Sequence, residues 1–503
     1  SGCSYRLIWT VACTIGNIGR MLSRAQQLVR SIRPLTIPKT NAAKNIKVMV
    51  VGGSIGGLAA AVSLRKAGAK VKVFEANQTR LGGGSGLGID SVSIGVLKGL
   101  GVDLDGLYSE EMVPMPMEKY LDRNGRYLYQ REDLPLFSCY WQDVYNMLME
   151  QLPEKAVIFD REVVEMACGA ADESGGGSVA LTFQDGDRIR GDLAVGADGV
   201  LSPVRRAAFG PRRLRFSGYS AWRGAVGAED VEPDVFDRFR DAYPHLGTCH
   251  YYELGNQSHS TFFELGGRFL NWNVFLRSDE PMAEEGKVSL IPDDERLSKL
   301  KEDTKDLISP EFFAMISSTK RPYLHDIYDA DPAKTFVNEH KDVVLVGDAA
   351  HPTTPHALRG ANMALQDGWA LGKCLAAAGG DDLPAALALY DRLRVAECRR
   401  SVLQARHLGR VKNGLHAFGA DFQTMDPDDF ESAYHASGVG MAVLPSHPVF
   451  ANPDFDPAEE GGQEGAAGLS VLGWDHVVLE AKDVGSLANF YTELLGLEAC
   501  RRP

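Results

Sequence analysis

Residues 46–75 read IKVMVVGGSIGGLAAAVSLRKAGAKVKVFE, and this stretch decides the fold. An apolar run at 46–51 precedes a glycine-rich turn, helically spaced apolar residues follow it, and a second apolar run ends at Glu75. A change from strand period to helix period and back is typical of a βαβ unit. Strand and helix signals alternate to about residue 210, so we predict an α/β protein that begins with this βαβ unit.

The glycine-rich turn contains a Gly-x-Gly-x-x-Gly frame in which Ser replaces the second glycine. Its residues are Gly52, Gly53, Ser54, Ile55, Gly56 and Gly57. Glycines here let the backbone approach a pyrophosphate, which binds at the start of the following helix. Glu75, 23 residues after Gly52, stands where an acid accepts hydrogen bonds from a ribose. The frame predicts dinucleotide binding without separating FAD from NAD, and the alternative is a turn that only packs helix on strand.

Two later motifs also follow apolar runs. The first, DLAVGADG at 192–199, precedes Ser202 and Arg205; the second, GDAAHP at 347–352, precedes PHALRGAN at 355–362. A carboxylate at a strand end can bond a polyol hydroxyl, and free N–H groups at the start of a helix can face an anion. Taken singly, each motif could equally be a strand-end turn with a capping Asp.

In this order and at these distances, the three motifs resemble the single-component flavoprotein aromatic hydroxylases, the para-hydroxybenzoate hydroxylase class. The GGSIGG loop, WQDVY from Trp141 and YSAWRG from Tyr219 are similar to its dihydroxypyridine hydroxylase branch. The resemblance covers about residues 46–410. Many relatives place Arg where Trp141 stands, so no cofactor contact is assigned to that position.

The resemblance implies an FAD-dependent monooxygenase with NAD(P)H as co-substrate. In this class NAD(P)H reduces FAD, O₂ forms a flavin C4a-hydroperoxide, and an electron-rich aromatic or heteroaromatic ring is hydroxylated. The alternatives are a flavin-dependent epoxidase, a halogenase or a non-catalytic flavin-binding remnant. The Lys-bearing motif usual in halogenases is not present at 82–94.

The resemblance also implies the cofactor contacts. Residues 52–57 would hold the FAD pyrophosphate and Glu75 the adenosine ribose, while Asp348 would bind the ribitol chain. Pro352 would lie near the flavin ring. The remaining implied contacts are Gly360, Ala361 and Asn362 at the flavin N1 and O2 edge, and Asp198 and Arg205 for both FAD and NAD(P)H.

Substrate contacts are expected from the strand-rich segment 218–277. It offers Tyr219, Trp222, His250, Tyr252, His259 and Phe263, of which alternation along strands lets only half face the ring. Tyr219 and His356, with Pro355 before it, are the candidate catalytic residues, because Tyr or His could deprotonate a phenol. The alternatives are core packing for the aromatic residues and a structural hydrogen bond for His356.

These motifs predict a Rossmann-like FAD-binding domain with an inserted, mostly antiparallel substrate sheet and C-terminal helices. The predicted order is a basic arm or presequence (1–45), the first FAD-binding part (46–217), the substrate sheet (218–330), the second FAD-binding part (331–425), a linker (426–470) and a partial unit (471–503). The last unit, beginning with WDHVVLE at 474–480, resembles the opening of a vicinal-oxygen-chelate domain. One imidazole, His476, cannot make a metal site, so we expect no metal.

Charge and hydropathy limit the partners. The formal net charge is −14, which argues against a general nucleic-acid binder, and no apolar run is long enough to span a membrane. Residues 1–74 contain twelve Lys or Arg and no Asp or Glu. The chain is expected to be cytoplasmic, with mitochondrial import as the alternative that the basic start suggests. The expected partners are a small aromatic substrate and O₂, and a homodimer is the assembly considered.

Overall fold

The computed structural model describes residues 34–37, 40, 45–79, 85–104, 112–122, 124–132, 134–169, 178–255 and 258–415. The linker, the C-terminal unit and nearly all of the basic N-terminal segment lie outside these residues, so the expectations for them stay predictions.

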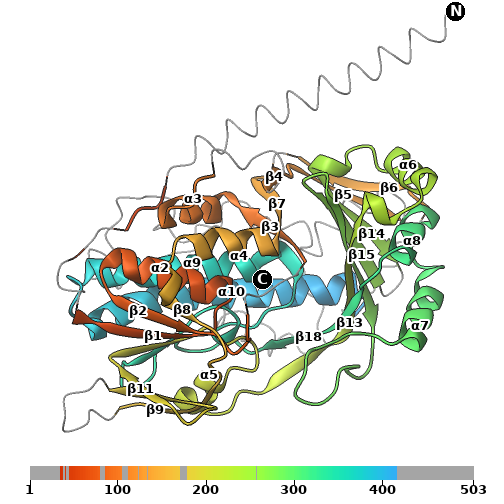
Figure 1. Cartoon of the computed structure of the whole chain (residues 1–503). Helices are drawn as coiled ribbons and strands as arrows, with labels where there is room; N and C mark the ends of the chain where they lie inside the picture. The colour runs from red at the N-terminus through yellow and green to blue at the C-terminus, as the bar shows by residue number, and fades with distance from the viewer. Residues whose placement is uncertain are drawn as a thin grey trace, which may run out of the picture.

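A five-stranded parallel sheet, in the order β19-β12-β1-β2-β8, forms the core of the first lobe (Figure 1). Its strands are β1 (Lys47–Val51), β2 (Lys70–Phe74), β8 (Val157–Ile158), β12 (Leu193–Gly196) and β19 (Val343–Leu345). The strands are short, mostly buried apolar runs, as expected of a sheet covered on both faces. Because β1, β12 and β19 are parallel neighbours, the three sequence motifs that follow them meet at one edge of the sheet.

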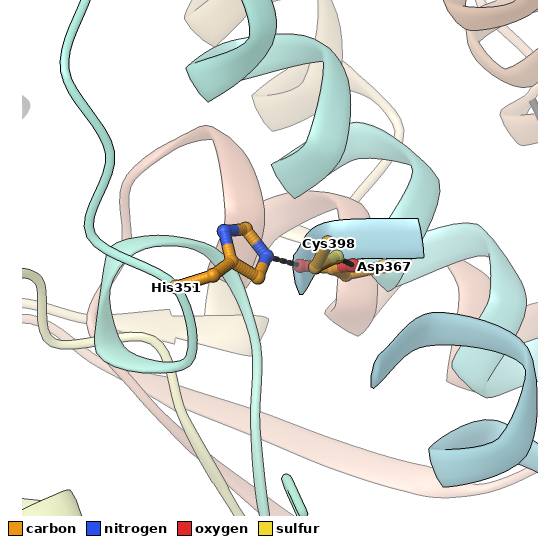
Figure 2. Close-up of side chains that lie close together, drawn as sticks. All are labelled: His351, Asp367 and Cys398. Carbon is orange, nitrogen blue, oxygen red and sulfur yellow. Dashed lines mark hydrogen bonds and ion pairs between the residues drawn. The ribbon is translucent and has the colours of Figure 1, made fainter. Parts of the chain in front are cut away.

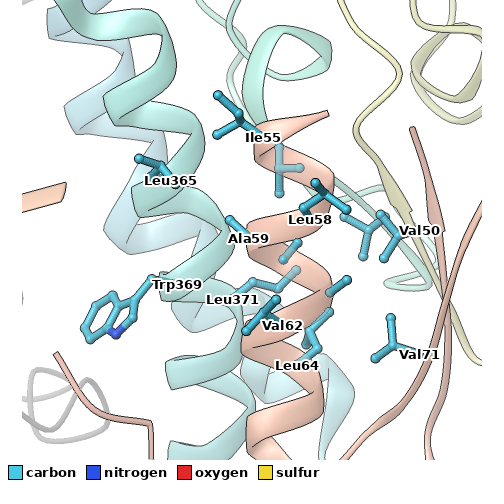
Figure 3. Close-up of a cluster of buried hydrophobic side chains, with 14 of the residues drawn as sticks. Val50, Ile55, Leu58, Ala59, Val62, Leu64, Val71, Leu365, Trp369 and Leu371 are labelled. Carbon is cyan, nitrogen blue, oxygen red and sulfur yellow. The ribbon is translucent and has the colours of Figure 1, made fainter. Parts of the chain in front are cut away.

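Helices α2 (Ile55–Ala67) and α9 (Arg359–Ala377) pack closely against each other beside this sheet. A Cβ on Gly368 would lie 2.5 Å from the Ala60 nitrogen, and one on Gly372 would lie 2.0 Å from Ser63 Oγ. Only glycines allow the two helices to approach so closely. Figure 3 shows the apolar side chains of α2 between α9 and the strands of the sheet.

The second lobe is an eight-stranded sheet in the order β17-β18-β13-β16-β15-β14-β5-β6, antiparallel except where β14 pairs with β5. Its strands are β5 (Met117–Asp122), β6 (Tyr127–Arg131), β13 (Leu214–Gly227), β14 (Cys249–Gly255), β15 (Ser258–Leu265), β16 (Phe269–Arg277), β17 (Ser289–Leu290) and β18 (Tyr323–Ala330). The mostly antiparallel sheet expected from 218–330 is present, and it also takes β5 and β6 from before residue 218.

One face of the eight-stranded sheet is covered by three helices (Figure 1). They are α6 (Pro233–Ala242), α7 (Asp294–Thr304) and α8 (Pro310–Ser317). An apolar cluster that includes Phe239, Phe262, Trp272 and Phe312 joins α6 and α8 to the strands. The opposite face of the sheet faces the first lobe and lines the cavity between the two lobes.

The remaining elements complete the first lobe and connect it to the second. They are the sheet of β3 (Gly86–Asp90), β7 (Leu136–Tyr140) and β4 (Met112–Pro114), the sheet of β9 (Val163–Ala167), β10 (Val179–Phe183) and β11 (Arg188–Gly191), and helices α3 (Ser91–Leu100), α4 (Trp141–Glu150), α5 (Pro203–Phe209) and α10 (Leu383–Lys412). Helix α10 packs on α9, and its last turns contact the eight-stranded sheet through Leu408 and Val411. Among the described residues, no helix is both long and apolar enough to cross a membrane.

Candidate active site

A cavity of about 410 Å³ is lined by residues of both lobes. The predicted site residues in its lining are Ser54, Ile55, Gly56, Asp348, Pro355, His356, Gly360 and Ala361. The predicted residues outside the lining are Gly52, Gly53, Gly57, Glu75, Asp198, Arg205, Tyr219, Pro352 and Asn362. The motif residues in the lining belong to the first lobe, while the eight-stranded sheet forms the other half of the wall.

The glycine-rich turn is shaped by close backbone approaches. Gly52 has a φ of +102°, and a Cβ there would lie 2.3 Å from the Ala197 oxygen. A Cβ on Gly57 would lie 1.9 Å from the Gly52 oxygen. Ser54, at the N-cap of α2, makes no capping hydrogen bond through its side chain. The first N–H groups of α2 therefore have no capping acceptor from Ser54, and this arrangement suits a phosphate.

Glu75 lies directly after β2 and is 6% exposed. Its carboxylate accepts hydrogen bonds from the Gly53 N–H (2.7 Å) and from the Asn77 N–H (2.9 Å). The carboxylate thus holds the glycine turn, and its remaining lone pairs can still accept a ribose hydroxyl. The predicted ribose contact stays a prediction.

Asp198 acts locally at the start of α5. Its carboxylate accepts hydrogen bonds from the Ser202 hydroxyl and from the Val204 N–H, and Ser202 Oγ in turn accepts from the Arg205 N–H at 2.9 Å. The neighbours Ala197 and Gly199, rather than Asp198, line the cavity. The cofactor roles of Asp198 and Arg205 therefore stay predictions beside an observed capping role.

Asp348 follows β19 in the turn η5 (Gly347–Ala349) and lines the cavity. Its side chain is exposed and has no hydrogen-bond partner within the described part of the chain. A free carboxylate in this position fits a hydroxyl of the ribitol chain. Pro352, expected near the flavin ring, lies just outside the lining, and its neighbour Thr353 lies within it.

A buried ion-pair network holds the loop that carries Asp348. Asp367 on α9 accepts hydrogen bonds from the Gly347 N–H (2.9 Å), His351 Nε2 (2.5 Å) and Arg394 Nε (2.7 Å). Figure 2 shows the His351 ring directed at this carboxylate, with Cys398 beside it. Although burial alone would raise it, the charges of His351 and Arg394 lower the pKa of Asp367 to about 2.

His351, Asp367 and Cys398 are residue types that bind metals, and their ligand atoms lie within 4.8 Å of one another. Both Asp367 oxygens, however, already accept hydrogen bonds, and the Arg394 guanidinium lies against one of them. A divalent cation here would face that guanidinium at close range. The contacts favour a positioning role for the cluster.

The start of α9 also faces the cavity. Ala357 and Leu358 precede it with φ values of 61° and 54°, and no side chain caps the helix. Gly360 and Ala361 in its first turn line the cavity. Asn362 instead binds β3, because its Nδ2 donates to the Gly88 oxygen and its Oδ1 accepts from the Asp90 N–H. The uncapped first turn therefore has N–H groups available to an electron-rich group in the cavity.

The eight-stranded sheet supplies the other half of the wall. α10 adds Lys412 to this wall. The lining residues from the sheet are Arg223, His250, Tyr252, His259, Thr261, Phe263, Asn273, Phe275, His325, Ile327 and Tyr328. The expected alternation is present on β14 and β15. Tyr251, between His250 and Tyr252, and Phe262, between Thr261 and Phe263, face the opposite side of the sheet and pack in the same apolar cluster as Trp222.

His356 lies where the two halves meet. It is 4% exposed, and its Nε2 lies 3.0 Å from Tyr219 Oη. Burial, together with the charges of Lys412 and Arg223, holds the pKa of His356 well below its usual value. Tyr219 is fully buried behind it, and burial raises the pKa of this phenol. His356 is therefore a neutral imidazole at the cavity, and the protonated phenol of Tyr219 positions it.

Sequence reasoning did not single out several lining residues. Arg223 lies inside the YSAWRG segment that carried the family resemblance, but the sequence did not indicate that its side chain lines the cavity. Lys412 ends a long helix, and no sequence signal marks it. Trp141, to which no contact was assigned, also lines the cavity.

The comparisons with known proteins agree with this geometry. The FAD binding domain family matches residues 45–404. A 3-hydroxybenzoate 6-hydroxylase from Polaromonas naphthalenivorans (strain CJ2) is 30% identical over 389 residues, covering 75% of this chain and 90% of the relative. A 6-hydroxynicotinate 3-monooxygenase from Pseudomonas fluorescens is 26% identical, covering 72% and 90%. The solved 2,6-dihydroxypyridine-3-hydroxylase from Arthrobacter nicotinovorans has a TM-score of 0.64 at 22% identity, covering 75% and 94%, and shows the shared fold.

The chain therefore belongs to the FAD binding domain family. Within it, the chain is an FAD-dependent monooxygenase of the aromatic hydroxylase class, with NAD(P)H as the co-substrate typical of that class. The C-terminal segment with His476 lies outside both the family match and the described residues, so its resemblance stays a prediction.

Proposed function

We propose that this monooxygenase hydroxylates a phenol or a hydroxylated heteroaromatic ring that binds against the eight-stranded sheet. The observation that carries the proposal is the division of one cavity into two unlike halves. One half offers backbone N–H groups and a free carboxylate, and the other offers aromatic and imidazole side chains. Hydroxylated benzoate and nicotinate are named in the relatives' activities, and this supports the choice of ring.

The described residues fit FAD. Residues 52–57 would hold its pyrophosphate, Asp348 its ribitol chain, and the first turn of α9 the edge of its ring. When bound, FAD supplies the activation of O₂ and the transfer of one oxygen atom. The protein holds the substrate ring against that centre, while the two lobes around the cavity exclude bulk water.

We assign proton transfer at the substrate hydroxyl to His356. Its imidazole is neutral, and only the Tyr219 hydrogen bond on Nε2 is present among the described residues, which leaves Nδ1 available. With the proton on Nε2, Nδ1 can accept the proton of a phenol and make the ring a better nucleophile. Tyr219 acts through His356, so we assign it a positioning role. Pro355 fixes the turn before His356.

Reconstitution with FAD tests the proposal. We expect a yellow protein whose NAD(P)H oxidation accelerates with a hydroxybenzoate, a hydroxynicotinate or a hydroxypyridine. The product should carry one atom from ¹⁸O₂. Oxidation that no aromatic compound stimulates would contradict the proposal, and an epoxide or halogenated product would assign the chain to an alternative flavin chemistry.

We infer the dihydroxypyridine hydroxylase-like branch from the GGSIGG, WQDVY and YSAWRG segments. A homodimer, and the choice between cytoplasm and mitochondrion, stay predictions that sedimentation and imaging of the tagged full chain can test.

A further inference from the structure

Lys412 is a buried lysine in the wall of the cavity. It is the last residue of α10, and the neighbouring Leu408 and Val411 pack the helix end on Tyr120 and Tyr252 of the eight-stranded sheet. Lys412 is 5% exposed and lines the cavity. The helix therefore holds an ammonium group in the part of the cavity formed by the eight-stranded sheet and the end of α10, called here the substrate half. The part formed by residues of the first lobe is called the flavin half.

The Lys412 ammonium has no hydrogen-bond or ion-pair partner in the part of the chain that the structure describes. Its Nζ lies 4.0 Å from the ring centre of Tyr252 and 5.3 Å from that of Tyr120. Glu118 interacts with it by charge alone; Glu118 accepts a hydrogen bond from Tyr120 Oη, and it lies outside the lining. Aromatic faces stabilise a cation only in part, so the buried charge favours a bound anion.

The surrounding wall is basic as well. Arg223 lines the same half, and its buried Nε has no acceptor among the described residues. Asp348, in the flavin half, is the only acidic residue among the described lining residues. Burial lowers the pKa of His250 to about 3, so this imidazole adds no charge at neutral pH. An anion in the substrate half would meet the two cations Arg223 and Lys412, and no carboxylate from the described residues that line that half.

We propose that Lys412 binds an anionic group of the aromatic substrate, either a carboxylate or a ring oxyanion, and so selects anionic rings over neutral ones. This inference rests on the proposed function for the location of the substrate. The phenyl rings of Phe263 and Phe275, which line the same half, contact the ring while the ammonium fixes its orientation. A charge-assisted hydrogen bond then sets which edge of the ring faces the flavin.

Calorimetric binding to the FAD-reconstituted full chain tests the inference without requiring turnover. The probes are matched pairs, 3-hydroxybenzoate with 3-hydroxybenzamide and 6-hydroxynicotinate with its amide. Lys412→Met should weaken binding of the acids at least about tenfold, the loss expected for one charged hydrogen bond, and leave the amides unchanged. Lys412→Arg should retain part of the preference. Arg400→Met, on the same helix but outside the lining, is the matched control.

A pH series sharpens the test. Burial lowers the pKa of Lys412 to about 8, so acid binding by the unmodified chain should weaken above pH 8 and Lys412→Arg should abolish that weakening. The groups that face Lys412 are Glu118 and Tyr120 on β5, His250 and Tyr252 on β14, His259 on β15 and His356 on η6 (His356–Leu358). The pKa values of these histidines are lowered, so none of them titrates near pH 8.

The outcomes separate the two proposals. Equal affinity for acid and amide in the unmodified chain, or a preference that Lys412→Met leaves intact, overturns the role of Lys412. Hydroxypyridines without a carboxylate, bound more tightly once their hydroxyl ionises, would identify a ring oxyanion as the anion. Selective binding of acids without any hydroxylation would instead contradict the proposed function and leave the Lys412 site standing.

Discussion

The two halves of the cavity are built by different means. In the flavin half much of the wall is backbone, at residues 54–56, at the first turns of α2 and α9, and at the loop that carries Asp348. In the substrate half, side chains from separate strands and from the end of α10 form the wall. A backbone site needs glycines and strand ends at fixed spacing, whereas a side-chain site needs only suitable residues on one face. The first kind leaves a sequence motif, and the second does not.

The buried charges differ between the halves in the same way. Arg394 and Asp367, beside the flavin half, bind each other and further groups. Lys412 and Arg223 line the substrate half, and among the described residues neither the Lys412 ammonium nor Arg223 Nε has a hydrogen-bond acceptor. Buried ions paired within the chain can position a loop, whereas a buried cation without a partner is costly and is stabilised when an anion binds to it.

The largest loss is expected from Asp367→Asn. The change removes one of the two carboxylates that compensate Arg394, and breaking such a buried pair costs about 3–5 kcal/mol of the free energy of unfolding. FAD should also bind more weakly, because the Gly347 loop loses its anchor. Urea unfolding and flavin absorbance measure the two effects. Asp234→Asn, in an exposed ion pair with Arg238, should change neither.

Gly57→Ala tests the backbone half directly. The new Cβ would lie 1.9 Å from the Gly52 oxygen, which is backbone and cannot move alone. We expect a loss of about 3 kcal/mol, at the upper end for overpacking, and a protein that retains little FAD. Gly125→Ala is the control for FAD content: its φ of +75° makes an alanine there strained, but nothing lies within 4 Å of the new Cβ and Gly125 lies outside the cavity lining, so FAD binding should be unchanged. Full FAD content in Gly57→Ala would show that the close turn is dispensable.

His356→Gln tests the junction of the halves. Loss of the proton acceptor should lower kcat about a hundredfold or more, with FAD content unchanged. Tyr219→Phe keeps the imidazole and removes only its partner, so the fall should be smaller. Since the pKa of His356 lies well below its usual value, the imidazole stays neutral and kcat should hold from pH 8 down to pH 6. A loss of activity along that range would argue against His356 as the base.

The sequence predicted the parallel sheet, the inserted sheet and the motif-bearing turns, because period and glycine spacing report on backbone geometry. It also named His250, as one of six candidates from the strand-rich segment 218–277, and His356, because a histidine can deprotonate a phenol. It missed the pairing of β5 with β14, which depends on contacts between segments more than a hundred residues apart. It also missed Lys412. The sequence pattern of α10 indicates a helix but does not say that the end of this helix packs on the eight-stranded sheet and lines the cavity.

His250 offers a smaller and reversible test of the substrate half. Its Nε2 is hydrogen-bonded to Thr261 Oγ1 and its Nδ1 to Tyr252 Oη, and burial lowers the pKa of His250 to about 3. Between that value and the ordinary one of about 6.5, the unfolded chain binds a proton that the folded chain does not, so falling pH favours unfolding. His250→Gln removes this proton. From pH 6.5 to pH 5 the unmodified chain should lose about 2 kcal/mol relative to the variant, measured by urea unfolding at each pH.

Thr261→Val separates the lost proton from the lost hydrogen bond. This variant removes a partner of His250 but keeps the imidazole, so it should be less stable by about 1 kcal/mol at every pH and follow the pH dependence of the unmodified chain. If His250→Gln instead follows that same pH dependence, the imidazole takes up its proton over the same pH range in the folded and the unfolded chain. The substrate half would then hold a third cation, and its preference for anions would strengthen as the pH falls.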